Sequence, residues 1–430
     1  MAPLLHEAAL DRPNTSVAIL AAVTDLTGLG AGLGGMLLAR MLHFIQHFAY
    51  GYSLDAVIST ESFLQGVTAS SPERRIAVML GCGLVAGFGW WGVYGWGRPL
   101  VSIRKAVGAA DPRMPIVTTV VHAVLQIVTV ALGSPLGREV APREIGSVFA
   151  GWLAHRAGLS VREQQIMVAC GAGAGLAAVY NVPLGGAVFV LEVLLGTFSL
   201  NVVIPAVATS VIAALVAWIG LGDESQYTVL HFTISASLVT WSIVAGPILG
   251  FAAYWFTRLT SAARRRAPRD WRLVVWCAGV FLIIGLLAVA FPQLLGNGKG
   301  PTQVGFDDGL GLKLTAVLLI LKLLIVTGSL RAGAEGGLLT PGLTVGALIA
   351  ILLGAAWNLV WPPVSQGAFA IVGAGAFLAS SMKMPITAIA LIVEFTRVDH
   401  DFLVPIFFAV AGSISVLKLC AQRYDPPRRG

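Results

Sequence analysis

Charged residues are scarce in this sequence. Only 11% of its 430 residues are charged, whereas soluble globular proteins carry roughly 25%. Since a soluble protein needs charged side chains on the surface around its core, this deficit excludes a soluble globular fold. The 57% share of hydrophobic residues and a mean hydropathy of +0.83 agree with a chain that faces lipid.

Cysteines, long linkers and alternating polar and apolar runs are also few or missing. The four cysteines lie inside apolar segments without metal-binding spacing, so we interpret them as packing residues. No linker divides the chain and no cleavable signal peptide is evident before Val17, so we expect a single membrane domain over residues 1–430. The apolar runs are long and do not alternate, which excludes a β-barrel.

Apolar stretches of membrane-spanning length recur along the whole chain. A spanning helix needs about 20 apolar residues. We expect the helix in the glycine-rich stretch 165–195 to break near Pro183, because proline cannot donate to the helix ladder. The sequence therefore predicts an all-α polytopic membrane protein. Its eleven predicted apolar segments are 17–38, 76–96, 114–132, 165–195, 202–220, 237–257, 273–292, 313–330, 338–361, 368–395 and 402–420.

Basic residues outnumber acidic ones by 28 to 21, but their distribution indicates membrane orientation rather than nucleic-acid binding. They gather in the short loops 98–113 and 258–272 and near the C-terminus. The positive-inside rule places such loops in the cytoplasm, where we expect both termini, and anionic lipid is their expected partner. The acidic or neutral loops 220–231 and 296–309 are expected outside.

Two motifs occur twice, in the same order and at nearly the same spacing. In each half a glycine-rich segment ends in a proline, and a second proline follows 41 or 44 residues later, with a glutamate nine residues beyond it. We therefore divide the chain into two related halves, approximately 76–220 and 271–420. The matched pairs are Pro142 with Pro341, Pro183 with Pro385, and Glu192 with Glu394.

Internal repeats of this kind are typical of channels and secondary transporters, whose sites lie at mid-membrane between the ends of broken helices. The glycine-rich turns of this chain directly precede helical runs. A helix N-terminus presents free N–H groups and a partial positive charge, so two such ends directed at one point form an anion site.

Glu139 is the candidate gate of that site. It begins a helical run, where the helix dipole favours a carboxylate, so it can occupy the anion site and leave it when protonated. The alternative is a solvated carboxylate at the membrane surface, or a partner of Arg138 or Arg143. We expect Arg138, Arg143 and Glu144 at the membrane interfaces.

Four other polar residues have competing interpretations. Glu192 and Glu394 occupy equivalent repeat positions. For both, a structural role, in which the carboxylate accepts hydrogen bonds from a helix end, is given at least as much weight as a role in transport. His43 and His47 lie one helical turn apart, but without a third ligand nearby they indicate a polar helix face rather than a metal site.

These residues carry a resemblance to a known family. Gly137-Arg138-Glu139, followed by Ile145 and Gly146, resembles the gating-glutamate motif of the CLC chloride channel and transporter family. The segment 336–341 (GGLLTP) is similar to the family's Gly-Gly-x-Phe-x-Pro motif. The segments 176–192 and 379–394 resemble the stretches that follow in each half of the family.

The resemblance implies the family fold, with two inverted-topology halves, many tilted and re-entrant helices, and a homodimer with one pore in each subunit. It implies a prokaryotic inner-membrane protein without the cytoplasmic nucleotide-sensing domains of other members, and no cofactor. It implies anions held by backbone amides near Leu338 and Leu339 and gated by Glu139, with Tyr424 as the candidate pore tyrosine. The supporting motif residues are Gly137, Arg138, Pro142, Gly337 and Pro341.

The sequence departs from the family pattern at four places, one of which is Leu339 at the position of the motif phenylalanine. Val140 and Ala141 replace the last two residues of the family's Gly-Arg-Glu-Gly-Pro. Trp96 stands where the family has its pore serine, which leaves the ion preference open. Val193 stands where proton-coupled members usually have an inner glutamate, so tight coupling by that route is not expected, although Glu139 and Glu192 remain candidates for a proton route.

We therefore expect a transport protein, not an enzyme, that conducts an anion, chloride above all, as a channel or with weak proton coupling. A strict anion/proton antiporter is the alternative. A membrane enzyme acting on a lipid phosphate headgroup is a remote alternative, because no clustered catalytic set is evident.

Overall fold

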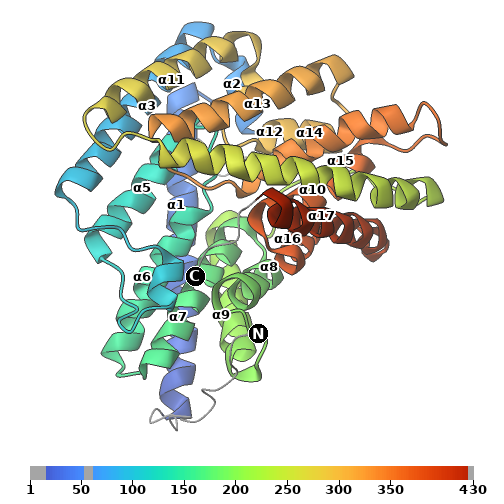
Figure 1. The fold of residues 1–430 in the computed structure, drawn as a ribbon. Helices are drawn as coiled ribbons and strands as arrows, with labels where there is room; N and C mark the ends of the chain where they lie inside the picture. The colour runs from blue at the N-terminus through green and yellow to red at the C-terminus, as the bar shows by residue number, and fades with distance from the viewer. Residues whose placement is uncertain (1–15, 53–61, 425–430) are drawn as a thin grey trace.

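The computed structural model describes residues 16–52 and 62–424. In these ranges the chain is almost entirely helical (Figure 1), and one isolated β-bridge is the only strand-like pairing, which confirms the all-α prediction. The helices of the first part are α1 (Val17–Tyr50), α2 (Phe63–Ala69), α3 (Pro72–Trp96), α4 (Ile103–Val107), α5 (Ile116–Ala131), α6 (Val140–Arg156), α7 (Val161–Tyr180), α8 (Pro183–Phe189), the π-helical η1 (Val190–Leu195) and α9 (Leu200–Leu221). The helices of the second part are α10 (Ala236–Arg265), α11 (Arg272–Ala290), the 3-10 helix η2 (Pro292–Leu294), α12 (Lys299–Phe306), α13 (Leu312–Ala332), α14 (Leu339–Trp357), α15 (Gln366–Met382), α16 (Pro385–Thr396), the 3-10 helix η3 (His400–Phe402) and α17 (Leu403–Tyr424).

Eight helical segments of the described chain are long and apolar enough to cross a membrane: α1, α3, α9, α10, α11, α13, α14 and η3 with α17. Every apolar segment predicted from the sequence coincides with one to three of the observed helices. The hydropathy pattern did not indicate α2, α4, α6 and α12. Three of these are short, and α6 has the charged pair Arg143 and Glu144 at its fourth and fifth positions.

The predicted break at Pro183 is confirmed and occurs again in the second half. α7 ends in Asn181, whose φ of 55° is left-handed, and α8 starts at Pro183. α15 ends in Lys383 with a φ of 56°, and α16 starts at Pro385. In both places a left-handed residue stops one helix, and proline starts the next at a position where its missing N–H costs no hydrogen bond.

The two parts of the chain repeat the same helix contacts. α1 packs on α9 and α6 on α7 in the first part, as α10 packs on α17 and α14 on α15 in the second. In Figure 1 the first set lies at the lower left and the second at the right, while α3 and α11 lie together at the upper left. Since α1 and α10 lie before the boundaries expected at residues 76 and 271, we propose that each half begins at these helices.

Glu192 and Glu394 join the two halves by exchanging helix caps. The carboxylate of Glu192, in η1, accepts hydrogen bonds from the Ile386 and Thr387 amides at the start of α16, at 3.0 and 2.7 Å. The carboxylate of Glu394, in α16, accepts from the Leu184 and Gly185 amides at the start of α8, at 2.9 and 2.7 Å. Each broken helix therefore depends on an acid from the other half, as the structural interpretation of these residues predicts.

Removing either cap should destabilise the protein to a similar extent. Glu192→Ala and Glu394→Ala each leave two amides of a helix N-terminus without acceptors, at a cost of about 1–3 kcal/mol. We expect both variants to melt at lower temperature than the parent when intrinsic fluorescence is followed in detergent. Asp401→Ala, at an exposed residue, is the control, and unchanged melting of both glutamate variants would contradict the caps.

Candidate functional site

Two helix N-termini meet at the centre of the molecule. The segments that lead into α6 and α14 run antiparallel, and Gly137 and Gly337 exchange two backbone hydrogen bonds of 2.8 and 2.9 Å. Pro142 and Pro341 occupy the third position of α6 and α14, where the amide N–H has no partner within the helix. The repeated prolines therefore mark equivalent helix starts, and both starts face the same point.

The carboxylate of Glu139 occupies this meeting point. Glu139 is the N-cap residue of α6 and is fully buried. Its Oε1 accepts a 2.7 Å hydrogen bond from the amide of Leu339, the first residue of α14. Its Oε2 has no hydrogen-bond partner among the described residues. A negative group thus lies where the free amides and the dipole of α14 attract an anion.

Glycine is required on both sides of this carboxylate. A Cβ atom at Gly137 would overlap Oε2 of Glu139, and a Cβ atom at Gly337 would overlap Oε1. Since every other residue carries a Cβ, the two glycines of the matched motifs leave the space that the carboxylate fills.

Arg138 and Arg143, which flank Glu139 in the sequence, have no ion pair with its carboxylate in the described part of the chain. Nε of Arg143 donates to the backbone carbonyl of Glu139 at 2.8 Å, and its guanidinium lies over the ring of Phe189, 5.1 Å from the centroid. The guanidinium of Arg138 lies 5.2 Å from the ring centroid of Tyr180. Aromatic rings therefore hold both guanidinium groups in place.

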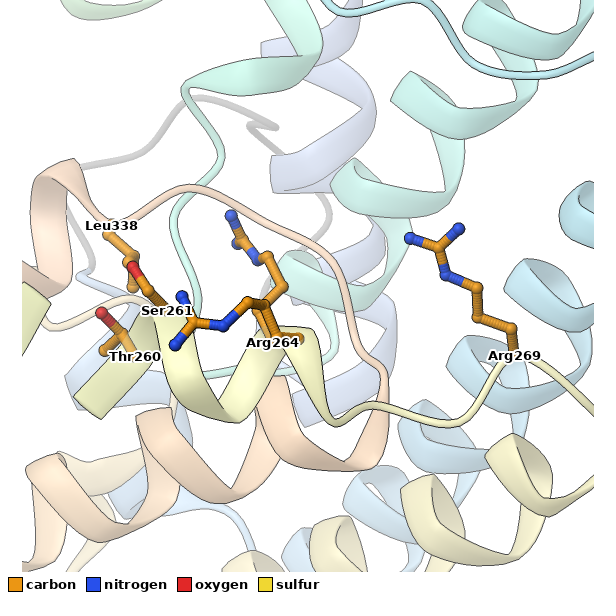
Figure 2. Close-up of a pocket in the computed structure, with 6 residues that line it drawn as sticks. Thr260, Ser261, Arg264, Arg269 and Leu338 are labelled. Atoms are coloured by element: carbon orange, nitrogen blue, oxygen red, sulfur yellow. The ribbon is translucent and has the colours of Figure 1, made fainter. Parts of the chain in front are cut away.

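A basic cavity leads toward the site from one side of the molecule. It measures about 290 Å³ and is lined by Thr260, Ser261, Arg264, Arg265, Arg269 and Leu338. Figure 2 shows Leu338 close to Ser261. Leu338 is the N-cap residue of α14, and Arg264 donates to the carbonyl of Gly336 at 2.9 Å. Clefts lined by one sign of charge concentrate the opposite ion, a role that the sequence did not indicate for these arginines.

Lys299 and Glu224 bring opposite charges to the neighbourhood of Arg138. Lys299 is exposed to solvent. The protein packed around it and the charge of Arg138 lower its pKa to about 8, while the charge of Glu224 acts in the opposite direction and raises the pKa.

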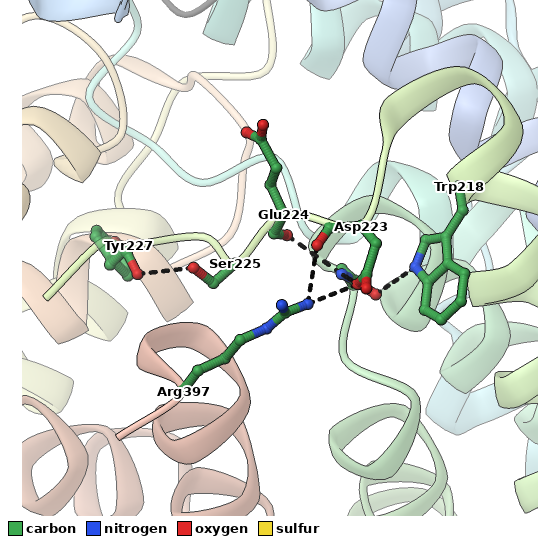
Figure 3. A network of polar contacts seen from close by, with 7 residues as sticks. Trp218, Asp223, Glu224, Ser225, Tyr227 and Arg397 are labelled. Carbon is green, nitrogen blue, oxygen red and sulfur yellow. Dashed lines mark hydrogen bonds and ion pairs between the residues drawn. The ribbon is translucent and has the colours of Figure 1, made fainter. Parts of the chain in front are cut away.

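A polar cluster close to Glu224 joins the two halves (Figure 3). Nδ2 of Asn181 donates to Asp223 at 2.9 Å, and Arg397, which ends α16, contacts the same carboxylate at 2.6 Å. Hydrogen bonds from Asn181 and Arg397 hold the pKa of Asp223 below its usual range. The cluster therefore ties the break after α7 to the end of α16.

Three residues singled out in the sequence lie away from the carboxylate of Glu139. Tyr424 ends α17, where its ring lies 6.0 Å from Tyr254, and no contact found for it within the described chain reaches Glu139. Trp96 ends α3 and is 84% exposed. The carbonyl of Val193 accepts a hydrogen bond from Arg104. The pore-ligand role of Tyr424 remains a prediction.

Arg138 and Glu144, which the sequence predicts at the membrane interfaces, are buried within the protein. Both are 8% exposed. Glu144 is buried because α5 faces it with a partner, His122, whose Nδ1 lies 2.9 Å from Oε2 of Glu144. A single sequence does not show this partner, because His122 lies 22 residues earlier on another helix.

Comparison with known proteins gives one consistent family. The model of the voltage gated chloride channel family matches residues 82–418. A "Voltage-gated ClC-type chloride channel ClcB" of Citrobacter koseri is 30% identical over 356 residues, covering 78% of this chain and 82% of the relative. A "Putative chloride channel protein ClcB-like" of Ralstonia nicotianae is 30% identical over 324 residues, covering 71% and 73%.

Solved structures share the fold at low sequence identity. A slow cyanobacterial Cl−/H+ antiporter superposes with a TM-score of 0.81 at 18% identity, covering 96% of both chains. A CLC-type fluoride/proton antiporter superposes with a TM-score of 0.67 at 19% identity, covering 94% of this chain and 97% of the other. These structures confirm the predicted fold of two inverted repeats with re-entrant helices.

A methyl group at Gly337 should destabilise the protein by displacing the carboxylate of Glu139. Overpacking of this kind costs about 1–3 kcal/mol, so we expect Gly337→Ala to melt at lower temperature than the parent in detergent. Gly279→Ala is the matched control, because a Cβ atom there meets no atom within 4 Å, and alanine favours the helix. Equal melting temperatures of the two variants would contradict the tight fit around Glu139.

Proposed function

This chain belongs to the voltage gated chloride channel family, known as CLC, and we propose that it moves chloride across the membrane through a pathway gated by Glu139. Family members are channels or transporters, so this integral membrane protein transports anions and is not an enzyme. The lipid-headgroup enzyme considered for the sequence is therefore abandoned.

One observation supports Glu139 as the gate. Its carboxylate accepts the Leu339 amide at 2.7 Å, in a fully buried position at the start of α14. A chloride ion carries the same charge and is attracted by the same amide and dipole. Carboxylate and chloride therefore compete for one place, and protonation removes the charge that holds the carboxylate there.

The basic cavity supports the rest of the pathway. It reaches Leu338, one residue before the amide that Glu139 occupies. We place Leu338 and Leu339 as the backbone anion ligands on this side. By the positive-inside rule the arginine-rich side faces the cytoplasm, with both chain ends there, in the inner membrane of a prokaryote. A homodimer and contact with membrane lipid complete the proposal.

Coupling to protons is proposed to be weak. Val193 has no titratable group at the family's inner relay position, and both oxygens of Glu192 accept hydrogen bonds at the start of α16. The relatives compared by sequence are named chloride channels, whereas two compared structures are named proton antiporters. A strict antiporter is therefore the second candidate.

Glu139→Gln should abolish the pH dependence of chloride efflux. Glutamine is uncharged like the protonated acid, so the gate no longer competes with chloride at any pH. In the parent, protonation of Glu139 frees the anion site, so efflux from proteoliposomes should rise as the pH is lowered. Asp270→Asn, in an exposed loop, should retain the parental profile. Strongly pH-dependent efflux in Glu139→Gln would exclude the gate.

The reversal potential of the purified protein in a bilayer separates weak from strict coupling. Under crossed chloride and pH gradients we expect a potential that follows the chloride gradient, with only a small shift when pH is changed on one side. A strict exchanger would weight both gradients in a fixed ratio, and that result would favour the antiporter.

A further inference from the structure

His122, Gln126 and Glu144 form a buried polar cluster apart from the carboxylate of Glu139. His122 and Gln126 lie one turn apart on α5, and Glu144 lies on α6. His122 is 7% exposed, Gln126 is fully buried and Glu144 is 8% exposed. Burying titratable groups in an apolar helix bundle costs free energy, and such groups often mark ion or proton pathways. The proposed gating by Glu139 does not involve His122, Gln126 or Glu144.

The geometry of the cluster lets one proton be shared between the histidine and the acid. Oε2 of Glu144 lies 2.9 Å from Nδ1 of His122, and Nε2 of Gln126 lies 2.9 Å from the same Nδ1 and 3.3 Å from the same Oε2. With the proton on Glu144, its O–H donates to the lone pair of Nδ1. With the proton on His122, Nδ1–H donates to Oε2, and the Gln126 amide donates to the same oxygen. Both protonation states are therefore hydrogen-bonded.

Two charged neighbours of the cluster, Glu335 and Arg264, lie on the side of the basic cavity. The charges that act on His122 are those of Glu144, Glu335 and Arg264, and Arg264 lines the basic cavity. Glu335 is 27% exposed in its side chain, lies 3.8 Å from Arg264 and accepts a 2.9 Å hydrogen bond from Tyr94 of α3. Glu335 and Arg264 are therefore partly exposed charged groups near the cluster, on the arginine-rich side.

The cluster is close to Glu139 along the chain. Glu144 follows Glu139 by five residues on the same helix, so about 7.5 Å of helix rise separates them. Arg143 lies between them in sequence, and its charge interacts with Glu139, Glu144 and Tyr180. A charge change at Glu144 therefore acts on the immediate surroundings of the gate.

We propose that His122 and Glu144 are the proton site through which protons from the arginine-rich side reach Glu139. A proton from solvent near Glu335 binds the His122 ring, the Nδ1 proton moves to Oε2 of Glu144, and water carries it to the carboxylate of Glu139. Only N–H and O–H bonds form and break. The route needs no acid at Val193, and it rests on the proposed function because it delivers protons to the proposed gate.

The test measures proton and chloride movement together. The full-length chain is reconstituted in liposomes, a chloride gradient is imposed, and chloride efflux and proton movement are followed with two electrodes. We expect His122→Gln and Glu144→Gln to lower the ratio of proton to chloride movement by about tenfold or more, a loss of the order expected for a missing acid–base group. Chloride efflux should continue in both variants.

Controls separate a relay from a structural role. Glu144→Asp keeps a titratable carboxyl and should retain proton movement, whereas Glu144→Gln keeps the hydrogen bonds and should lose it. Asp111→Asn, an exposed acid paired with Arg113, should behave as the parent. Size-exclusion profiles show which variants are folded, and the His122→Gln variant provides the test if Glu144→Gln does not fold.

The outcomes separate the relay from the gate. Proton movement that persists in both His122→Gln and Glu144→Gln overturns the relay, as does a parent protein that moves chloride without protons. Either result leaves the Glu139 gate standing. A parent protein without chloride efflux, or a Glu139→Gln variant that keeps its pH dependence, overturns the proposed function instead.

Discussion

The hydrogen bond from the Leu339 amide to the buried carboxylate of Glu139 ties the two halves of this protein together. It requires two helices to start at one point, and the exchanged bonds between Gly137 and Gly337 bring those starts together. It also requires both residues to be glycine, because any Cβ atom would take the space of the carboxylate. The prolines and glycines of the repeated motifs thus serve one geometric purpose, which is to aim two helix ends at the same position.

The halves match in backbone but differ in side chains at the centre. Both breaks use a left-handed residue followed two positions later by proline, and both caps use a glutamate from the opposite half. Glu139, however, has Leu338 as its counterpart when the prolines of α6 and α14 are aligned. The matching backbone therefore forms two facing helix starts, and in the proposed mechanism the single acid Glu139 makes the anion site between them sensitive to pH.

Much of this arrangement could be predicted from the sequence, since it depends on local chemistry. Spans follow from apolar runs, the break follows from Pro183, and the position of Glu139 follows from a motif at a helix start. What could not be predicted depends on contacts between distant segments. The contact between His122 and Glu144 exists only because α5 packs on α6. In the sequence the arginines of α10 indicate only membrane orientation, whereas in the structure they line a cavity that reaches Leu338.

The crossed caps also constrain how the chain can be synthesised. The amides that begin α8 are capped by an acid 210 residues later. At about 5–20 residues per second, the ribosome needs roughly 10–40 s to reach it. Through that interval the start of α8 has no partner from its own half, and unpaired amides are not tolerated in lipid. The newly made first half must therefore be held in contact with water or with the insertion machinery until the second half arrives.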